Sequence, residues 1–168
     1  QINEVDKTFN GGMSNFLAKH PLDSISVSAP SAAGSAQGTY QTHSQKLTVK
    51  SVKKISEPWM LEGTVAVARG QKTDSKKDMQ DATFTHELGH HVAFTVIKNS
   101  PGGPDGIFKK SIIDSYQKDK KKVSDYAKTE PHEYFAESFT AYHFSPGSLS
   151  STAKKMVEDV MKRAGELS

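Results

Sequence analysis

The sequence of 168 residues contains no cysteine. Disulfides therefore cannot hold the fold, and any metal site has to use histidine and carboxylate ligands in place of thiolates. No run of 18 apolar residues occurs, so a membrane span is not expected. The net charge is only +3, from 22 basic and 19 acidic residues. Since no basic face interleaved with aromatic residues accompanies this small excess, nucleic-acid binding is not expected either.

The length is that of one ordinary domain, and we treat residues 1–168 as a single domain. The hydrophobic fraction of 35% is low, but aliphatic and aromatic residues recur along the whole chain, as in a folded domain with a well-solvated surface. The chain starts at Gln1 without Met or an apolar leader. A mature secreted protein and a domain excised from a longer protein would both begin in this way.

The first half of the chain shows one helical pattern and several strand patterns. Apolar residues at spacings of three and four predict a helix from Ile2 to Lys19, weakened by Gly11-Gly12. Residues rich in Ser, Ala and Gly predict a loop from Pro30 to Gly38. The predicted strands are Ser24–Ser28, the hairpin pair Thr39–Thr42 and Lys46–Val49, and Gly63–Arg69.

The second half has the period of helices. Predicted helices run from Asp74 to Lys98, from Ile107 to Tyr116, from Glu130-Pro131 to Tyr142, and from Leu149 to Ala164. Lys118 to Lys122 is predicted to be a solvated connector. A small mixed β-sheet followed by helices is the order typical of an α+β domain, which is the fold class that we predict.

The pattern HExxH lies at residues 86–90, in the middle of the predicted helix that ends at Lys98. Residues four apart on a helix are offset by about 40° and one turn, so His86 and His90 can face one ion. Glu87 then points to the side where a water molecule bound by the ion would lie, and can take its proton as general base. His91 points about 100° away from His90, so we expect a structural or exposed role for it.

A catalytic zinc needs a third protein ligand and an open fourth position. The extended motif HExxHxxGxxH is excluded, because Ala93 and Val96 occupy its last two specified positions. Glu133 and Glu137 are one turn apart on a later predicted helix. Glu133 can serve as the third ligand while Glu137 accepts the second N–H of His86, although an exposed acidic stripe is the alternative. His132 and His143 are left without a role.

The segments HELGH at 86–90, YAKT at 126–129 and EYFAESF at 133–139 together resemble a known family. They are similar to the gluzincin zinc endopeptidases that include the catalytic domain of anthrax lethal factor and the clostridial Pro-Pro endopeptidases. The resemblance covers about residues 80 to 143. It implies a zincin-like fold around an HExxH active-site helix, one catalytic Zn²⁺ on His86, His90 and Glu133, and Glu87 as base.

The resemblance further implies that Tyr126 stabilises the oxyanion and that Glu137 contacts a zinc ligand without binding the ion itself. A phenol donor fits that chemistry, but a tyrosine that packs its ring under a loop is the alternative. The family binds an extended peptide along an exposed strand. The residues Gly63, Thr64, Val65, Ala66 and Val67 are the local candidate for that strand, with an ordinary core strand as the alternative.

Together these features predict a zinc metalloendopeptidase that acts on a peptide or protein substrate, secreted or delivered in a toxin or virion. Two other interpretations stay open. One is a catalytically silent domain of a toxin or phage particle that keeps zinc for stability or binding. The other is a zinc hydrolase of a non-peptide amide. Glu87 and Tyr126 argue against the silent domain, because a structural metal site needs neither residue.

Overall fold

The computed structural model describes residues 1–28, 38–50, 63–65 and 76–168. Its elements, in chain order, are α1 (Ile2–Thr8), α2 (Gly12–Lys19), β1 (Ser24–Ser28), β2 (Gly38–Gln41), β3 (Lys46–Lys50), α4 (Lys76–Lys98), α5 (Ile107–Asp119), α6 (Pro131–Phe144) and α7 (Ser151–Leu167). Short 3₁₀ turns join the later helices, among them η4 (Lys120–Lys122) and η5 (Tyr126–Lys128). The α+β class is confirmed, and the predicted helices of the second half are present.

The described strands form a mixed sheet in the order β1-β3-β2. β1 runs parallel to β3, and β2 pairs with β3 as the predicted antiparallel hairpin. Leu47 and Val49 of β3 are buried against the core. β2 is at the edge of the described sheet, where Gly38 lies close to Thr83 and Glu87 of α4.

The single helix predicted from Ile2 to Lys19 is wrong, because the first helix ends at Thr8 and a second helix starts at Gly12. Asn10 and Gly11 have φ angles of 53° and 80°, in the left-handed region that ends a right-handed helix. Asp6 stabilises the corner, since its carboxylate accepts hydrogen bonds from the backbone N–H and the hydroxyl of Ser14 at 2.7 and 2.8 Å. The apolar spacing continues across the break because Val5, Met13 and Phe16 all enter the same core.

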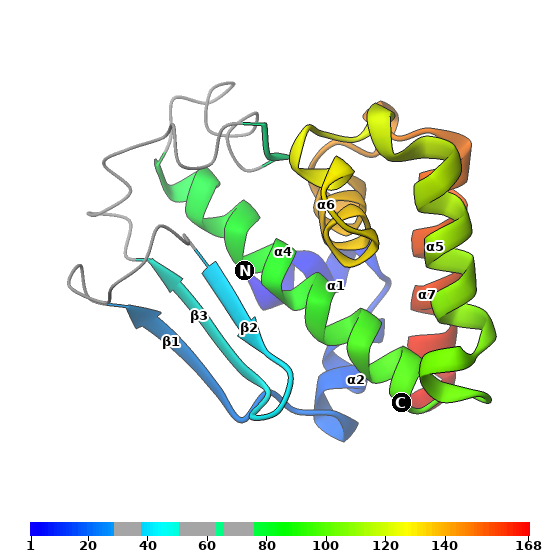
Figure 1. The fold of residues 1–168 in the computed structure, drawn as a ribbon. Helices are drawn as coiled ribbons and strands as arrows, with labels where there is room; N and C mark the ends of the chain where they lie inside the picture. The colour runs from blue at the N-terminus through cyan, green and yellow to red at the C-terminus, as the bar shows by residue number, and fades with distance from the viewer. Residues whose placement is uncertain (29–37, 51–62, 66–75) are drawn as a thin grey trace.

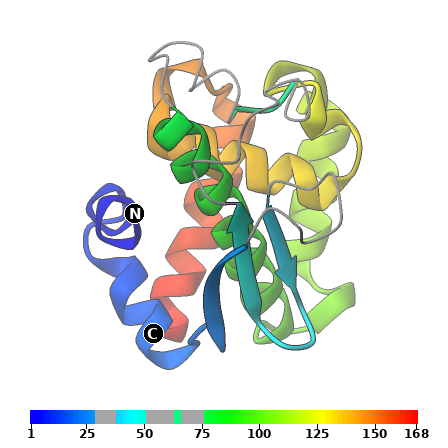
Figure 2. The same ribbon diagram turned by 90° about the vertical axis from the view of Figure 1, so that its left-hand side faces the viewer.

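Helix α4 passes between the sheet and the helices α5, α6 and α7 (Figure 1). Figure 2, seen from the sheet side, shows α4 behind the strands. Its buried residues Leu88, Val92 and Val96 join a core that includes Phe135 and Phe139 of α6. A helix covered on two sides buries polar residues as well as apolar ones, so side chains such as His86 and Glu87 are held in fixed surroundings.

Helix α6 begins where the sequence predicts. Glu130 is extended, with φ −149° and ψ 153°, and Pro131 occupies the first turn, where its missing N–H costs nothing. This start places Glu133 in the first turn of α6 and Glu137 one turn later. Glu137 is buried, as the predicted site requires and an exposed acidic stripe does not.

The strand predicted over Gly63–Arg69 is wrong where the structure describes it. Gly63 is in a turn with a φ of 80°, Thr64 is in a bend, and Val65 has helical geometry. Ala66 and Val67 lie outside the described residues, as does most of the loop predicted from Pro30 to Gly38. Alternating small residues alone do not identify a strand, because the same residues suit a turn that packs closely on its neighbours.

No helix in the described part of the chain is long and apolar enough to cross a membrane.

A larger side chain at Gly89 is expected to separate α4 from α6. A Cβ atom at this position would lie 3.2 Å from Cα of Ala136 and 3.2 Å from Cδ1 of Phe139, closer than ordinary carbon contact. Gly89→Leu should lower the free energy of unfolding by about 1–3 kcal/mol or more in a denaturant titration. Gly165→Leu on α7 is the matched control, since nothing lies within 4 Å of its Cβ position. Equal stability of the two variants would contradict the close crossing.

Candidate metal centre

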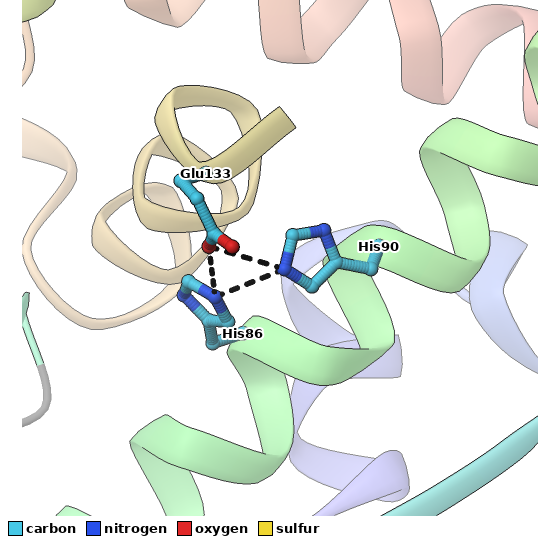
Figure 3. Close-up of side chains that lie close together, drawn as sticks. All are labelled: His86, His90 and Glu133. Carbon is cyan, nitrogen blue, oxygen red and sulfur yellow. Dashed lines mark hydrogen bonds and ion pairs between the residues drawn. The ribbon is translucent and has the colours of Figure 1, made fainter. Parts of the chain in front are cut away.

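His86 and His90 project from α4 toward Glu133 of α6, as Figure 3 shows. The Nε2 atom of His86 lies 2.9 Å from Oε2 of Glu133 and 3.1 Å from Nε2 of His90. The Nε2 atom of His90 lies 3.3 Å from the same Glu133 oxygen. His86 and His90 are one helical turn apart, and Glu133 follows His90 by 43 residues. One atom from each of the three side chains thus forms a small triangle.

The dimensions of this triangle suit a tetrahedral ion. Zinc binds imidazole nitrogen and carboxylate oxygen at about 2.0–2.1 Å, so the edges of its coordination tetrahedron are about 3.3 Å long. The edges found are 2.9, 3.1 and 3.3 Å. Two histidines and one carboxylate also form a donor set that zinc uses in catalytic sites with an open fourth position. The His86, His90 and Glu133 side chains therefore fit this ion in geometry and in chemistry.

The electrostatics of the triangle favour a cation. Burial alone would lower the pKa of His86, but hydrogen bonds with Glu133 and Glu137 outweigh it and raise the pKa to about 10. Burial would raise the pKa of Glu133, but hydrogen bonds from His132, His86 and His90 hold it well below its usual range. Burial and the neighbouring His86 lower the pKa of His90, which favours its neutral, metal-binding form.

Glu137 supports His86 from the side away from the triangle. Its Oε1 atom lies 2.8 Å from Nδ1 of His86, which fixes the tautomer that leaves Nε2 toward the other ligands. Its Oε2 atom accepts hydrogen bonds from Ser124 Oγ and from the backbone N–H of Val65, both at 2.7 Å. The predicted contact between Glu137 and His86 is thus present, and Glu137 also connects two loop segments to the site.

His132, which sequence reasoning left without a role, also contacts the triangle. Its Nε2 atom lies 3.3 Å from Oε1 of Glu133, the oxygen that does not face both histidines of α4. Its ring centroid is 5.5 Å from that of His90. His132 therefore helps to orient Glu133. Its position directly before Glu133 was visible in the sequence, but adjacent residues on a helix point in different directions, so adjacency alone did not indicate contact.

Glu87 is buried between α4 and the edge strand β2. A Cβ atom at Gly38 would lie 2.7 Å from Oε1 of Glu87, so only glycine lets the strand approach this closely. Burial raises the pKa of Glu87 to about 7, with the carboxylates of Glu133 and Glu137 adding to the effect and His86 opposing it. A carboxyl with a pKa near neutrality is well matched to accepting and returning a proton. Sequence reasoning placed Gly38 at the end of a loop and missed this role.

Tyr126 lies in η5 with its ring centroid 5.9 Å from that of His86. Burial and the nearby carboxylate of Glu133 raise its pKa to about 12, so the phenol stays protonated and can donate a hydrogen bond. Ser124 Oγ accepts the N–H of Ala127 at 3.1 Å, and the carbonyl of Gly63 accepts the N–H of Tyr126 at 3.0 Å. The turn that carries Tyr126 is thus held by the segments that Glu137 connects.

One cavity of about 610 Å³ joins these groups. The described residues that line it are Gly38, Thr39, Tyr40, Thr42, His86, Glu87, His90, Ala93, Phe94, Ile97, Tyr126, His132 and Glu133. The β2 strand therefore borders the cavity, whereas the Gly63 carbonyl accepts the N–H of Tyr126 and the N–H of Val65 donates to Glu137. The segment that was expected to bind the substrate as a strand does not line this cavity at residues 63–65, the part of it that is described. These residues instead hold Tyr126 and Glu137 in place.

His91 faces away from the triangle, as expected. It is fully buried, and its two ring nitrogens lie 2.9 Å from the Tyr40 hydroxyl and 2.9 Å from the His20 carbonyl. The carbonyl can only accept, so Nε2 donates to His20 and Nδ1 accepts from Tyr40. His91 therefore ties α4 to β2, which keeps the strand beside Glu87.

Comparison of the chain with protein-family models finds no match, and comparison with curated protein sequences finds no match either.

Loss of Glu137 is expected to weaken both the fold and the metal site. Glu137→Ala leaves three donors without their acceptor, two of them in buried contacts, so the free energy of unfolding should fall by about 3 kcal/mol. Zinc affinity should fall about 10- to 100-fold, because His86 loses its orienting partner. Denaturant unfolding and a zinc competition titration measure the two effects. Ser124→Ala, which removes one donor and leaves the carboxylate in place, is the milder control. Unchanged zinc affinity in Glu137→Ala would contradict the role given to its contact with His86.

Proposed function

We propose that this protein is a zinc endopeptidase of the gluzincin type. The observation that carries the proposal is the triangle of His86, His90 and Glu133 at tetrahedral spacing, with the buried carboxyl of Glu87 lining the same cavity. A site that only stabilises a fold needs four protein ligands and no general base. Three ligand atoms that open into a cavity of about 610 Å³ are instead what a hydrolytic site needs.

His86, His90 and Glu133 would hold one zinc ion. When bound, zinc supplies Lewis acidity, which lowers the pKa of water and polarises a carbonyl. Glu87, next to His86 on α4, accepts the proton of the attacking water and returns it to the leaving amine. Its burial beside β2 keeps its pKa near neutrality, so the same carboxyl is suited to both steps.

Tyr126 is the proposed oxyanion donor. Its phenol stays protonated because burial and Glu133 raise its pKa, and its ring lines the cavity beside His86. The residue is 39% exposed, so it is not enclosed by the protein. A donor held in place before the reaction stabilises the developing negative charge more than water would.

We propose that β2 is the strand on which the substrate lies, in place of the segment 63–67. β2 is at the edge of the described sheet, and its residues Gly38, Thr39 and Tyr40 line the cavity. An extended peptide added to this edge would pair with the backbone and pass beside Glu87. The active-site helix α4 and the edge strand β2 then form the zincin-like arrangement implied by the sequence resemblance. This binding mode favours a peptide over a non-peptide amide.

The purified protein is expected to bind one zinc ion per chain. At zinc concentrations 100-fold above the dissociation constant, the folded state should gain about 2.7 kcal/mol, which raises the melting temperature. His90→Ala and Glu133→Ala should abolish this gain, whereas His43→Ala, an exposed histidine of the β2–β3 turn, should retain it. Metal analysis and thermal unfolding provide the measurements. A wild-type protein that takes up no zinc would overturn the proposed function.

Glu87→Gln is expected to keep the fold and the zinc and to lose activity. The amide is nearly the same size as the carboxyl but accepts no proton, so kcat should fall by about 10²–10⁴-fold. Cleavage of a diverse peptide library, followed by mass spectrometry, identifies a substrate for the kinetic comparison. Glu166→Gln, on the exposed surface of α7, should cleave like the wild type. Full activity in Glu87→Gln would exclude Glu87 as the base. Zinc uptake without cleavage of any peptide would favour the silent, zinc-stabilised domain.

A further inference from the structure

A second cavity of about 300 Å³ lies beside the candidate metal centre. The described residues that line it are Ala93, Ile97, Lys109, Ile112, Ile113, Glu130, Pro131 and His132. They come from α4, from α5 and from the start of α6, so the cavity is formed where the three helices meet. No step of the proposed mechanism uses this cavity.

The walls of the second cavity are mostly aliphatic. Ala93, Ile97, Ile112, Ile113 and Pro131 supply them, and Lys109, Glu130 and His132 are the polar residues among those described. Lys109 and Glu130 are exposed, so their charged groups are in contact with solvent. Water gains few hydrogen bonds against such walls, and an apolar group that displaces it is favoured. The cavity is at the small end of ligand pockets, about 300–1,000 Å³, which suits one side chain better than a cofactor.

The two cavities are neighbours along α4. Ala93, Ile97 and His132 line both of them. Ala93 and Ile97 follow His90 by three and seven residues, which places them on the same face of the helix, about 5 and 10 Å further along its axis. An extended peptide advances about 3.3 Å per residue. A substrate whose scissile bond lies at His90 therefore reaches the second cavity about two or three residues away.

We propose that this second cavity is a specificity subsite that takes a large apolar side chain of the substrate, two or three residues from the scissile bond. The inference rests on the proposed peptidase function, because the ligand is a peptide substrate. The ability of the cavity to bind an apolar group does not depend on catalysis. His132 lines both cavities, its neighbour Glu133 lines the first and its neighbour Pro131 lines the second. A bound peptide that reaches from the metal centre to the second cavity would pass His132.

The test compares cleavage of matched peptides by the zinc-loaded protein. One library substrate is resynthesised with Leu, Phe, Ala or Asp at each of the three positions on either side of the scissile bond. At one position two or three residues away, kcat/KM should be at least about tenfold higher with Leu or Phe than with Ala. Absence of an apolar preference at all of those positions would overturn the proposal.

Variants at Ile113 decide whether this cavity causes the preference. Ile113 lines only the second cavity and is half-buried, so a change there leaves the metal centre intact. Ile113→Asp and the cavity-filling Ile113→Trp should reduce the ratio of Leu to Ala peptides to below about twofold, with little change for the Ala peptide. Ile107, also on α5 but 66% exposed, is the matched control, and Ile107→Asp should keep the wild-type ratio. A wild-type ratio in both Ile113 variants would assign the preference to another site.

A binding measurement separates this proposal from the proposed function. N-acetyl-leucinamide and N-acetyl-alaninamide are titrated into protein with labelled isoleucine methyl groups. The leucine compound should shift the signals of Ile112 and Ile113 at concentrations where the alanine compound does not. Such shifts with no peptide cleaved would refute the peptidase and keep the apolar site. Peptide cleavage without these shifts, and with selectivity unchanged in Ile113→Asp, would refute the subsite and keep the peptidase.

Discussion

Helices α4 and α6 pack closely at Gly89, where a Cβ atom would lie only 3.2 Å from the backbone of Ala136 and from the ring of Phe139. His86 and His90 lie on one side of this crossing and Glu133 on the other, so the distance between the helices sets the distances within the triangle. A side chain at Gly89 would act as a spacer. The glycine inside the HELGH segment therefore helps to set the spacing of His86, His90 and Glu133, although it contributes no atom to the triangle.

The site also depends on a balance of charge in a region sheltered from water. Glu133 and Glu137 would repel each other at one turn of spacing, yet both contact imidazoles. Burial disfavours every ionised group in this region, and the contacts between opposite charges compensate for it. Glu137 connects this region to neighbouring segments, because its carboxylate also accepts hydrogen bonds from Ser124 and Val65. The turn of Tyr126 and the support of His86 are consequently parts of one network.

Local patterns predicted some elements well and others poorly. Three features follow from short-range chemistry. Proline geometry starts α6 at Pro131, a glycine- and proline-rich segment follows the end of α4 at Lys98, and turn residues join β2 to β3. The helix predicted from Ile2 to Lys19 was wrong because two short helices on either side of a left-handed corner bury the same face. Gly63 was misread as part of a strand, since a small residue suits a turn in close contact as well as it suits a sheet.

The sequence alone identified the candidate site residues, because helical periodicity places His86, Glu87 and His90 on one helix and Glu133 and Glu137 on another. Only the tertiary structure decided what these residues face. Two of these contacts join elements that are distant in sequence, namely the triangle of ligand atoms and the approach of Glu87 to Gly38. A third, between the neighbours His132 and Glu133, depends on side-chain directions that packing sets. Periodicity specifies the face of a helix, whereas the partner of that face is set by how the whole core packs.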